Sequence, residues 1–204
     1  DSVLTAAIIN RFIEDAEFRI FYDVPIDAYR YVSEGAFVTD DNTINAPGKG
    51  TQGATGAVFV RGIEVFNSTS ATTGQGVWLQ KKDQTYLSEY VGRLTGSEGD
   101  LTNQDTTGLP KYYAMFGGAT GTTSTTSGGM YIAPTPDQNY KFRIYYTMMP
   151  KSLVTETSGT YISQYFPNGL LYACLVEAYG FLKGPMDMLT LYENKYKQEV
   201  QKFA

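Results

Sequence analysis

The chain has 204 residues, a formal net charge of −5, 18% charged residues and no histidine. This length suits one domain, or one domain with an elaboration. The acidic balance argues against a nucleic-acid binder that neutralises phosphates with Lys and Arg. The lack of histidine excludes Ser-His-Asp, Cys-His and HExxH catalysis, and the lone Cys174 excludes an internal disulfide or a cysteine-ligated zinc site.

The balance of residue types favours an assembly protein. Aromatic residues make up 14% of the chain, whereas its 18% of charged residues lies below the roughly 25% usual in soluble domains. Apolar surface of this kind usually marks contact with partners, although a large β-rich core would use the same tyrosines. No apolar run reaches the length of about 18 residues that a membrane span needs. Since the chain starts at Asp1 without a methionine, we expect residues upstream.

Residues 1–21 are predicted to form a helix that ends before Pro25. The large apolar residues recur at helical spacing and give a broad apolar face, and the charged residues fall largely off that face. The apolar set is Leu4, Ile8, Ile9, Phe12, Ile13, Ala16 and Ile20, and the charged set is Glu14, Asp15, Glu17 and Arg19.

The next part of the chain has the composition of β-strands separated by polar loops. Residues 57–66 are rich in β-branched and aromatic side chains, and residues 77–80 form a second, shorter run of this kind. Residues 84–91 suit one or two helical turns. Residues 39–56 are predicted to be a polar, glycine-rich loop.

Two further strands are predicted at 111–116 and 129–133, paired as a hairpin. The segment between them, 117–129, is a low-complexity run of Gly, Thr and Ser that we expect to be exposed. Residues 140–147 alternate strictly between apolar and other side chains, which is the clearest strand pattern in the chain. The residues predicted to be buried are Tyr140, Phe142, Ile144 and Tyr146, and those predicted to face water are Lys141 and Arg143.

A helical period returns near the C-terminus. Pro167 suits the first turn of a helix, and Gly184 with Pro185 separates that helix from a second one that runs to the end of the chain. We expect the N-terminal helix to pack against this pair, because each helix must cover its apolar stripe.

These elements together predict an α+β fold. Residues 1–25 and 160–204 are expected to form a small helical bundle. Residues 26–159 are expected to form a mainly antiparallel β-rich domain that is inserted between the helices and carries long exposed Gly/Thr loops.

No motif predicts catalysis, a cofactor or a metal ion. The Gly-Lys-Gly-Thr sequence around Lys49 is not a phosphate loop, because glycine follows the lysine where Ser or Thr is needed. Two carboxylate pairs, Asp40 with Asp41 and Glu98 with Asp100, lie in glycine-rich loops and lack the alternating ligand pattern of a calcium site. We interpret them as solvated loops, and assign no catalytic, cofactor-binding or metal-ligating residue.

Two other features have a functional and an ordinary interpretation. Cys174 lies on the apolar stripe of a predicted helix, so a buried structural thiol is favoured over a reactive one. Trp78, Tyr86 and Tyr90 are able to stack on a sugar, but packing beneath the β-rich domain is the favoured interpretation.

An ordered series of segments runs through the chain, including Tyr-Ile-Ala-Pro-Thr-Pro-Asp at 131–137 and Tyr-Lys-Phe-Arg-Ile-Tyr-Tyr at 140–146. The series resembles the head-to-tail adaptor, or head completion, proteins of tailed bacteriophages over about residues 10–25 and most of 57–204. The resemblance depends on the order of these segments along the chain and not on any single segment. The other segments are 12–20, 77–83, 111–113, 150–153, 170–178, 181–185 and 191–193.

The resemblance implies a virion structural protein that is not an enzyme. Such proteins form a ring, normally of twelve copies, that binds beneath the portal protein and connects the capsid to a tail or nozzle protein. DNA passes through the channel without specific binding, and a negatively charged wall would repel it. The resemblance further implies assembly in the host cytoplasm, and no membrane.

The resemblance also implies that the C-terminal end docks into the portal. The last predicted helix keeps Tyr196, Val200 and Phe203 on one side up to the terminus, whereas a free helix end normally frays. These three residues are therefore the candidate portal interface. Packing on the N-terminal helix is the alternative: docking is favoured for Phe203, and the two interpretations stay open for Tyr196.

Two other functions compete with the adaptor. A carbohydrate- or receptor-binding tail module would use the aromatic β-rich domain and its loops, and would form trimers. A glycosidase would need two acids facing each other across a cleft, whereas the acids of this chain cluster in loops.

Overall fold

The computed structural model describes residues 3–47, 56–72, 74–90, 107–116 and 129–203. The chain divides into two compact units. Asp1–Tyr29 with Pro150–Ala204 is called the helical unit here, and Arg30–Met149 the β-rich unit. Helices precede and follow sheets that are mainly antiparallel, so the predicted α+β class is confirmed. The assignment of 1–25 with 160–204 and of 26–159 to separate domains stays a prediction.

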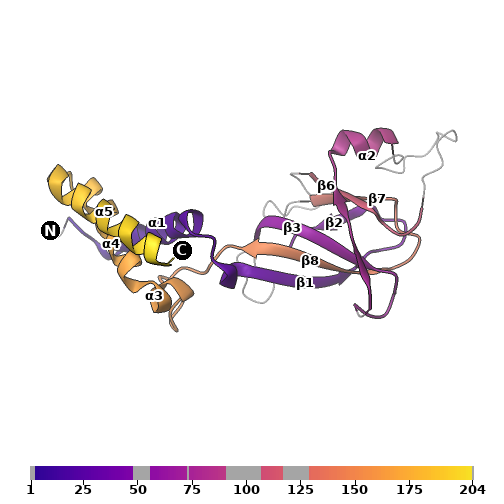
Figure 1. Ribbon diagram of the computed structural model, residues 1–204, viewed down its shortest axis with the longest axis horizontal. Helices are drawn as coiled ribbons and strands as arrows, with labels where there is room; N and C mark the ends of the chain where they lie inside the picture. Colours follow the sequence, from indigo (N-terminus) through magenta and orange to yellow (C-terminus); the bar gives the residue numbers. More distant parts are fainter. Residues whose placement is uncertain (1–2, 48–55, 73, 91–106, 117–128, 204) are drawn as a thin grey trace. The chain divides into compact units, whose positions relative to one another are not determined.

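The helical unit contains both long helices that were predicted near the C-terminus. Its elements are α1 (Ala6–Asp23), a short 3₁₀ turn η1 (Asp27–Tyr29), α3 (Tyr161–Tyr165), α4 (Pro167–Phe181) and α5 (Met186–Phe203) (Figure 1). Thr5 caps α1, because its Oγ1 accepts a hydrogen bond from the Ile8 amide. Helix α1 therefore begins later than the sequence pattern predicted.

Helix α1 packs against the C-terminal pair, as predicted. The rings of Phe12 and Phe181 meet edge to face at 5.5 Å between centroids, and Arg19 donates to the Glu193 carboxylate at 2.6 Å. The prediction that Glu17 lies off the buried face is wrong, since this side chain is only 5% exposed. Its carboxylate accepts hydrogen bonds from the Leu153 amide at 3.0 and 3.2 Å, so donors from a distant loop allow the charge to be buried.

Helix α3 was not predicted. Thr160 and Ser163 form a reciprocal capping box, in which each side chain accepts from the other residue's backbone amide. This short helix ends at Phe166, which is itself buried and precedes Pro167 at the start of α4.

The β-rich unit contains two four-stranded sheets. The first has the order β1 (Arg30–Ala36), β8 (Lys141–Met148), β3 (Ala57–Phe66), β4 (Gly76–Trp78), and all its pairs are antiparallel. The second has the order β2 (Thr43–Asn45), β7 (Gly129–Ala133), β6 (Tyr112–Phe116), β5 (Gln80–Lys81), with β5 parallel to β6. Helix α2 (Gln84–Tyr90) follows β5. The predicted hairpin of β6 and β7 is confirmed, with Tyr113 opposite Ile132.

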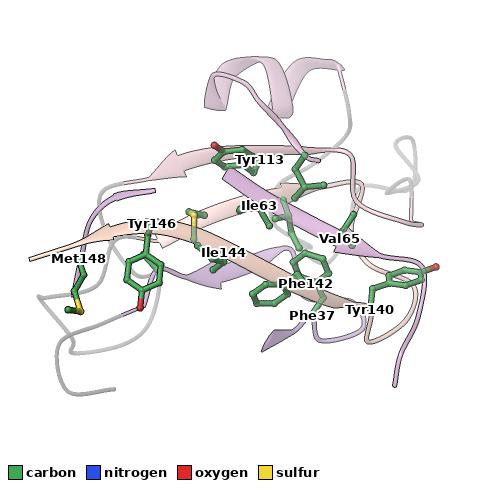
Figure 2. Packing of buried hydrophobic residues seen from close by; sticks show 13 residues of the cluster. Phe37, Ile63, Val65, Tyr113, Tyr140, Phe142, Ile144, Tyr146 and Met148 are labelled. Atoms are coloured by element: carbon green, nitrogen blue, oxygen red, sulfur yellow. The ribbon is translucent and has the colours of Figure 1, made fainter. Parts of the chain in front are cut away.

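The core of this unit lies between the two sheets (Figure 2). The predicted buried face of β8 is confirmed: Tyr140, which precedes the strand, and Phe142, Ile144 and Tyr146 all belong to the core. Side chains from the second sheet, such as Met130 and Ile132, complete it.

The opposite face of β8 is less exposed to solvent than predicted. Arg143 is half-buried, donates to Glu34 of β1 at 2.8 Å, and lies over the Phe66 ring at 5.2 Å. The prediction that Arg143 faces water is therefore only partly right. A long side chain with a charged partner and an aromatic neighbour covers the sheet while its guanidinium stays solvated.

Candidate functional site

Tyr196, the first candidate portal-contact residue, lies inside the helical unit. Its side chain is only 2% exposed, and its hydroxyl donates to Asp23 Oδ2 at 2.6 Å. The Arg19 guanidinium lies 4.4 Å from the ring centroid. Burial raises the pKa of the Tyr196 hydroxyl, and the hydrogen bond to Asp23 adds to the effect. Tyr196 thus fixes α5 on α1.

The other two candidates, Val200 and Phe203, lie on the last two turns of α5 and are half-buried. The Phe203 ring stacks on Phe166, with 4.5 Å between centroids and an angle of 26° between planes. One face of the Phe203 ring is therefore covered by Phe166 of the same chain. Tyr196 and Phe203 thus lie on the same helix in different surroundings: Tyr196 is buried against α1, whereas Phe203 is half-buried against Phe166.

Gly169 sets the position of the Phe166 ring. A Cβ atom at position 169 would overlap the Phe166 ring carbons, so glycine is needed for this close approach. Phe166, in turn, is the support on which Phe203 stacks. The terminal aromatic residue of α5 is thus positioned by a glycine in the first turns of α4. The sequence pattern indicated Phe203 but did not indicate either of these residues.

A second apolar surface in the helical unit was not predicted. Phe181, Leu182 and Met186 are all exposed where α4 ends and α5 begins. The Phe181 ring also contacts the ring of Phe12 of α1. Exposed neighbouring apolar side chains of this kind mark a contact surface more often than isolated ones do.

The carboxylate pairs show no catalytic arrangement within the described residues. Asp41 accepts from both the amide and the hydroxyl of Thr43, at 2.8 and 2.6 Å, and so fixes a turn. Glu98, Asp100 and Lys49 lie outside the described residues. Across the described ranges, no three Asp, Glu or Cys side chains gather in a way that would hold a metal ion, and no helix is long and apolar enough to cross a bilayer.

Cys174 is half-buried on α4, and its thiol points to the Phe12 carbonyl oxygen at 3.9 Å. Burial raises the pKa of this thiol to about 11, and the Glu17 carboxylate adds to the effect. A thiol of this kind stays protonated at neutral pH and is a weak nucleophile. The interpretation of Cys174 as a structural residue is consistent with these surroundings.

The predicted aromatic group does not lie beneath the β-rich domain as a set. Trp78 is 54% exposed and packs at 4.8 Å against the Tyr145 ring, on the face of the first sheet that turns away from the core. The Tyr86 ring instead meets the Tyr112 ring in a T-shaped contact, with 5.8 Å between centroids. The side chain of Tyr90 lies outside the described part of the structure.

Comparison with known proteins gives one finding on identity. A family model described as "SU10 adaptor protein" matches residues 1–203. No curated protein matches the chain. The family match covers nearly the whole sequence, including both the helical and the β-rich unit.

Proposed function

Because the chain belongs to the SU10 adaptor protein family, a family of phage head-tail adaptors, we propose that it forms a ring below the portal and connects the capsid to the tail. Membership makes the chain a structural adaptor and a virion component of a bacteriophage. The single observation that carries the proposal is the family match over residues 1–203. The copy number proposed for the ring is twelve.

The proposed partners are the portal protein on one side and a tail or nozzle protein on the other. The net charge of −5 supports a channel that DNA crosses without specific binding, since a negatively charged wall repels the phosphate backbone. Assembly is proposed to take place in the host cytoplasm. The proposed role requires no catalytic step.

The proposed portal contact is the end of α5. Val200 and Phe203 are half-buried in the isolated chain, so each keeps surface that a partner is able to cover. Tyr196 serves this contact indirectly, because its bond to Asp23 and the Arg19 guanidinium over its ring hold α5 in place. Aromatic anchors at the centre of an interface typically contribute about 2 kcal/mol or more to binding.

Truncation of the last helical turn tests this contact. Deletion of residues 200–204 is expected to leave near-native circular dichroism and to abolish binding to purified portal rings. Phe203→Ala is expected to weaken portal binding at least tenfold, while the matched variant Lys202→Ala, changed at an exposed position on the same turn, binds as the wild type does. Unchanged affinity of the truncated chain would move the portal contact to the flank of the helices or to the β-rich unit.

One observation favours a second candidate, a carbohydrate-binding tail module. Trp78 presents half of its surface next to Tyr145 and Glu64, and an exposed ring beside polar groups suits sugar stacking. This candidate predicts trimers and glycan binding that Trp78→Ala abolishes. A ring without glycan binding excludes it.

A further inference from the structure

The first sheet of the β-rich unit ends in an unusually open edge. Strand β1 has seven residues and pairs with β8 in continuous register from Arg30 opposite Thr147 to Ala36 opposite Lys141. It contains no proline. Its other side has no partner strand among the described residues (Figure 1). Natural sheets usually protect such edges with short strands, bulges, proline or charged side chains. Of these, β1 carries only charged side chains, Arg30 and Glu34, and the Glu34 carboxylate is paired with Arg143 of the neighbouring strand. The three other sheet edges are two or three residues long.

The backbone groups that point outward from β1 can be assigned from the hydrogen bonds next to it. The Phe37 amide donates to the Tyr140 carbonyl oxygen, and Phe37 and Tyr140 continue the register of β1 and β8. Since hydrogen-bonded pairs alternate along an antiparallel ladder, the N–H and C=O groups of Val32, Glu34 and Ala36 point away from β8.

Strand β4 forms the opposite edge of the same sheet, and its outward backbone groups follow from the same alternation. The Leu79 amide donates to the Ile63 carbonyl oxygen and continues the register of β3 and β4. The backbone groups of Gly76 and Trp78 therefore point outward. Because every pair in this sheet is antiparallel and the sheet has four strands, its two edge strands, β1 and β4, run in opposite directions.

The two edges also carry matching apolar side chains. Each has a pair of neighbouring residues that are about half exposed: Tyr31 at 43% and Val32 at 51% on β1, Val77 at 51% and Trp78 at 54% on β4. The strand registers place Tyr31 and Val77 on the core face of the sheet, with Tyr146 and Val65. They place Val32 and Trp78 on the other face, with Tyr145 and Glu64.

We propose that β1 of one copy pairs with β4 of the next copy, so that the first sheets of neighbouring subunits join into a continuous antiparallel sheet. The proposal rests on the proposed ring and names the surface by which its copies meet. Neighbouring copies in a ring of many subunits differ by only a small rotation and so nearly keep their strand directions. The opposite directions of β1 and β4 therefore give antiparallel pairing at every junction. A ring also needs two different, complementary patches on each subunit, and β1 and β4 supply them.

The preferred register places Tyr31 opposite Val77. Both residues direct their own backbone groups inward, so they form a close, non-hydrogen-bonded pair across the junction. Trp78 then lies diagonal to Val32 on the other face, within reach of an aromatic ring. Large apolar side chains that are exposed in one copy are covered on both faces of the joined sheet.

Cysteine cross-linking tests the junction. In a Cys174→Ala background, the double variant Tyr31→Cys with Val77→Cys is expected to give a ladder of disulfide-linked oligomers under mild oxidation. Cβ atoms at such a close pair lie near the spacing that a disulfide needs. Each single variant is expected to stay uncross-linked. A disulfide-linked dimer from Tyr31→Cys alone would show that β1 pairs with itself, and would overturn the proposal.

A charge variant gives an independent readout. Val32→Lys is expected to prevent ring formation while the circular dichroism spectrum stays that of the folded chain, because a lysine at the centre of an edge strand opposes pairing. The matched control is Val38→Lys, an exposed valine just beyond the end of β1, which is expected to form rings. Equal ring formation by both lysine variants would contradict the proposal.

Electron microscopy of the unmodified chain distinguishes failure of the β1–β4 junction from failure of the proposed ring. Rings in the microscope without a disulfide ladder overturn the β1–β4 junction and leave the proposed function standing. A ladder without closed rings supports the junction and overturns the ring. The absence of both overturns the two together.

Discussion

The two units of the chain treat their apolar residues in different ways. The β-rich unit closes a large core between its two sheets, with Ile63, Val65, Ile132 and Ile144 almost wholly buried. The helical unit buries a smaller set near Ile20 and leaves many large apolar side chains exposed. Most of the exposed large apolar residues among those described belong to the helical unit, although it is the shorter of the two.

This difference indicates which unit depends on partners. A unit that buries its apolar side chains internally has less to gain from association, whereas exposed apolar area is covered when copies or partners bind. The helical unit is therefore expected to gain more stability on assembly. The β-rich unit is expected to contribute its edges, where its exposed apolar residues include Tyr31, Val32, Val77 and Trp78.

The largest effect is expected from opening a cavity in the β-rich core. Ile144 is 2% exposed, so Ile144→Ala is expected to lower the free energy of unfolding by about 2–5 kcal/mol. Lys141→Ala, on the other face of the same strand, is expected to cost under about 0.5 kcal/mol. Trp78 is the single tryptophan of the chain and lies on this sheet, so its fluorescence during urea unfolding reports the effect. Equal losses at both positions would contradict the assigned faces of β8.

A smaller effect is expected from the contact that holds α5. Tyr196→Phe keeps the ring but removes the hydroxyl that donates to Asp23, so the free energy of unfolding is expected to fall by about 1 kcal/mol. Tyr165→Phe, at an exposed tyrosine of the same unit, serves as the control. The helical circular dichroism signal in urea measures both. A loss at position 165 as large as that at 196 would show that the Asp23 bond is not the cause.

Glu17 is expected to give the helical unit a pH dependence. Burial raises the pKa of Glu17 above the ordinary value of 4.5, against the lowering effect of its hydrogen bonds to Ser152, Leu153 and Thr160. The folded chain binds the proton of the Glu17 carboxyl more tightly than the unfolded chain does. The stabilisation that this proton contributes is therefore fully present below the ordinary pKa of 4.5. It is lost as the pH rises through the folded pKa.

The comparison of wild type with Glu17→Gln isolates this contribution. The amide stays neutral at all pH values, so the stability of the wild type relative to the variant is expected to fall as the pH rises above the ordinary pKa of 4.5. Urea unfolding followed by circular dichroism measures the difference at each pH. A wild-type advantage that grows with pH would contradict the assigned direction.

The smallest effect on the isolated chain is expected at the exposed end of the helical unit. Met186 is 73% exposed, so Met186→Gln is expected to change the free energy of unfolding by less than about 0.5 kcal/mol. Thermal unfolding of the isolated chain measures it. A loss of several kcal/mol would mean that this end of the unit is more tightly packed than its exposure indicates.

The sequence predicted those elements whose pattern is local and regular. The strict alternation of residues 140–147 indicated β8 and its buried face, and proline and glycine positions indicated the bounds of α4 and α5. Strand β1 could not be predicted in this way, because Ser33 and Gly35 interrupt any apolar pattern. Gly35 is needed there because the Phe142 ring occupies the space that a Cβ would take, and that neighbour is distant in sequence.

The candidate site was predictable only in part, for a similar reason. The helical spacing of Tyr196, Val200 and Phe203 placed them on one side of α5, but their burial depends on other elements. Asp23 and Arg19 of α1 enclose Tyr196, and Phe166 supports Phe203. The burial of Glu17 likewise depends on the loop at Leu153, which no periodicity connects to α1. The capping box of Thr160 and Ser163 has serine where the usual sequence signature has Glu or Gln, so the sequence did not indicate α3.

The most direct test of the adaptor function is electron microscopy of the chain mixed with purified portal rings. The account predicts closed rings of this chain, stacked on one face of the portal and showing rotational symmetry in class averages. Deletion of residues 200–204 is expected to remove the stacked ring while the portal ring remains. Free monomers or trimers beside bare portal rings, at concentrations where both proteins are folded, would contradict the account.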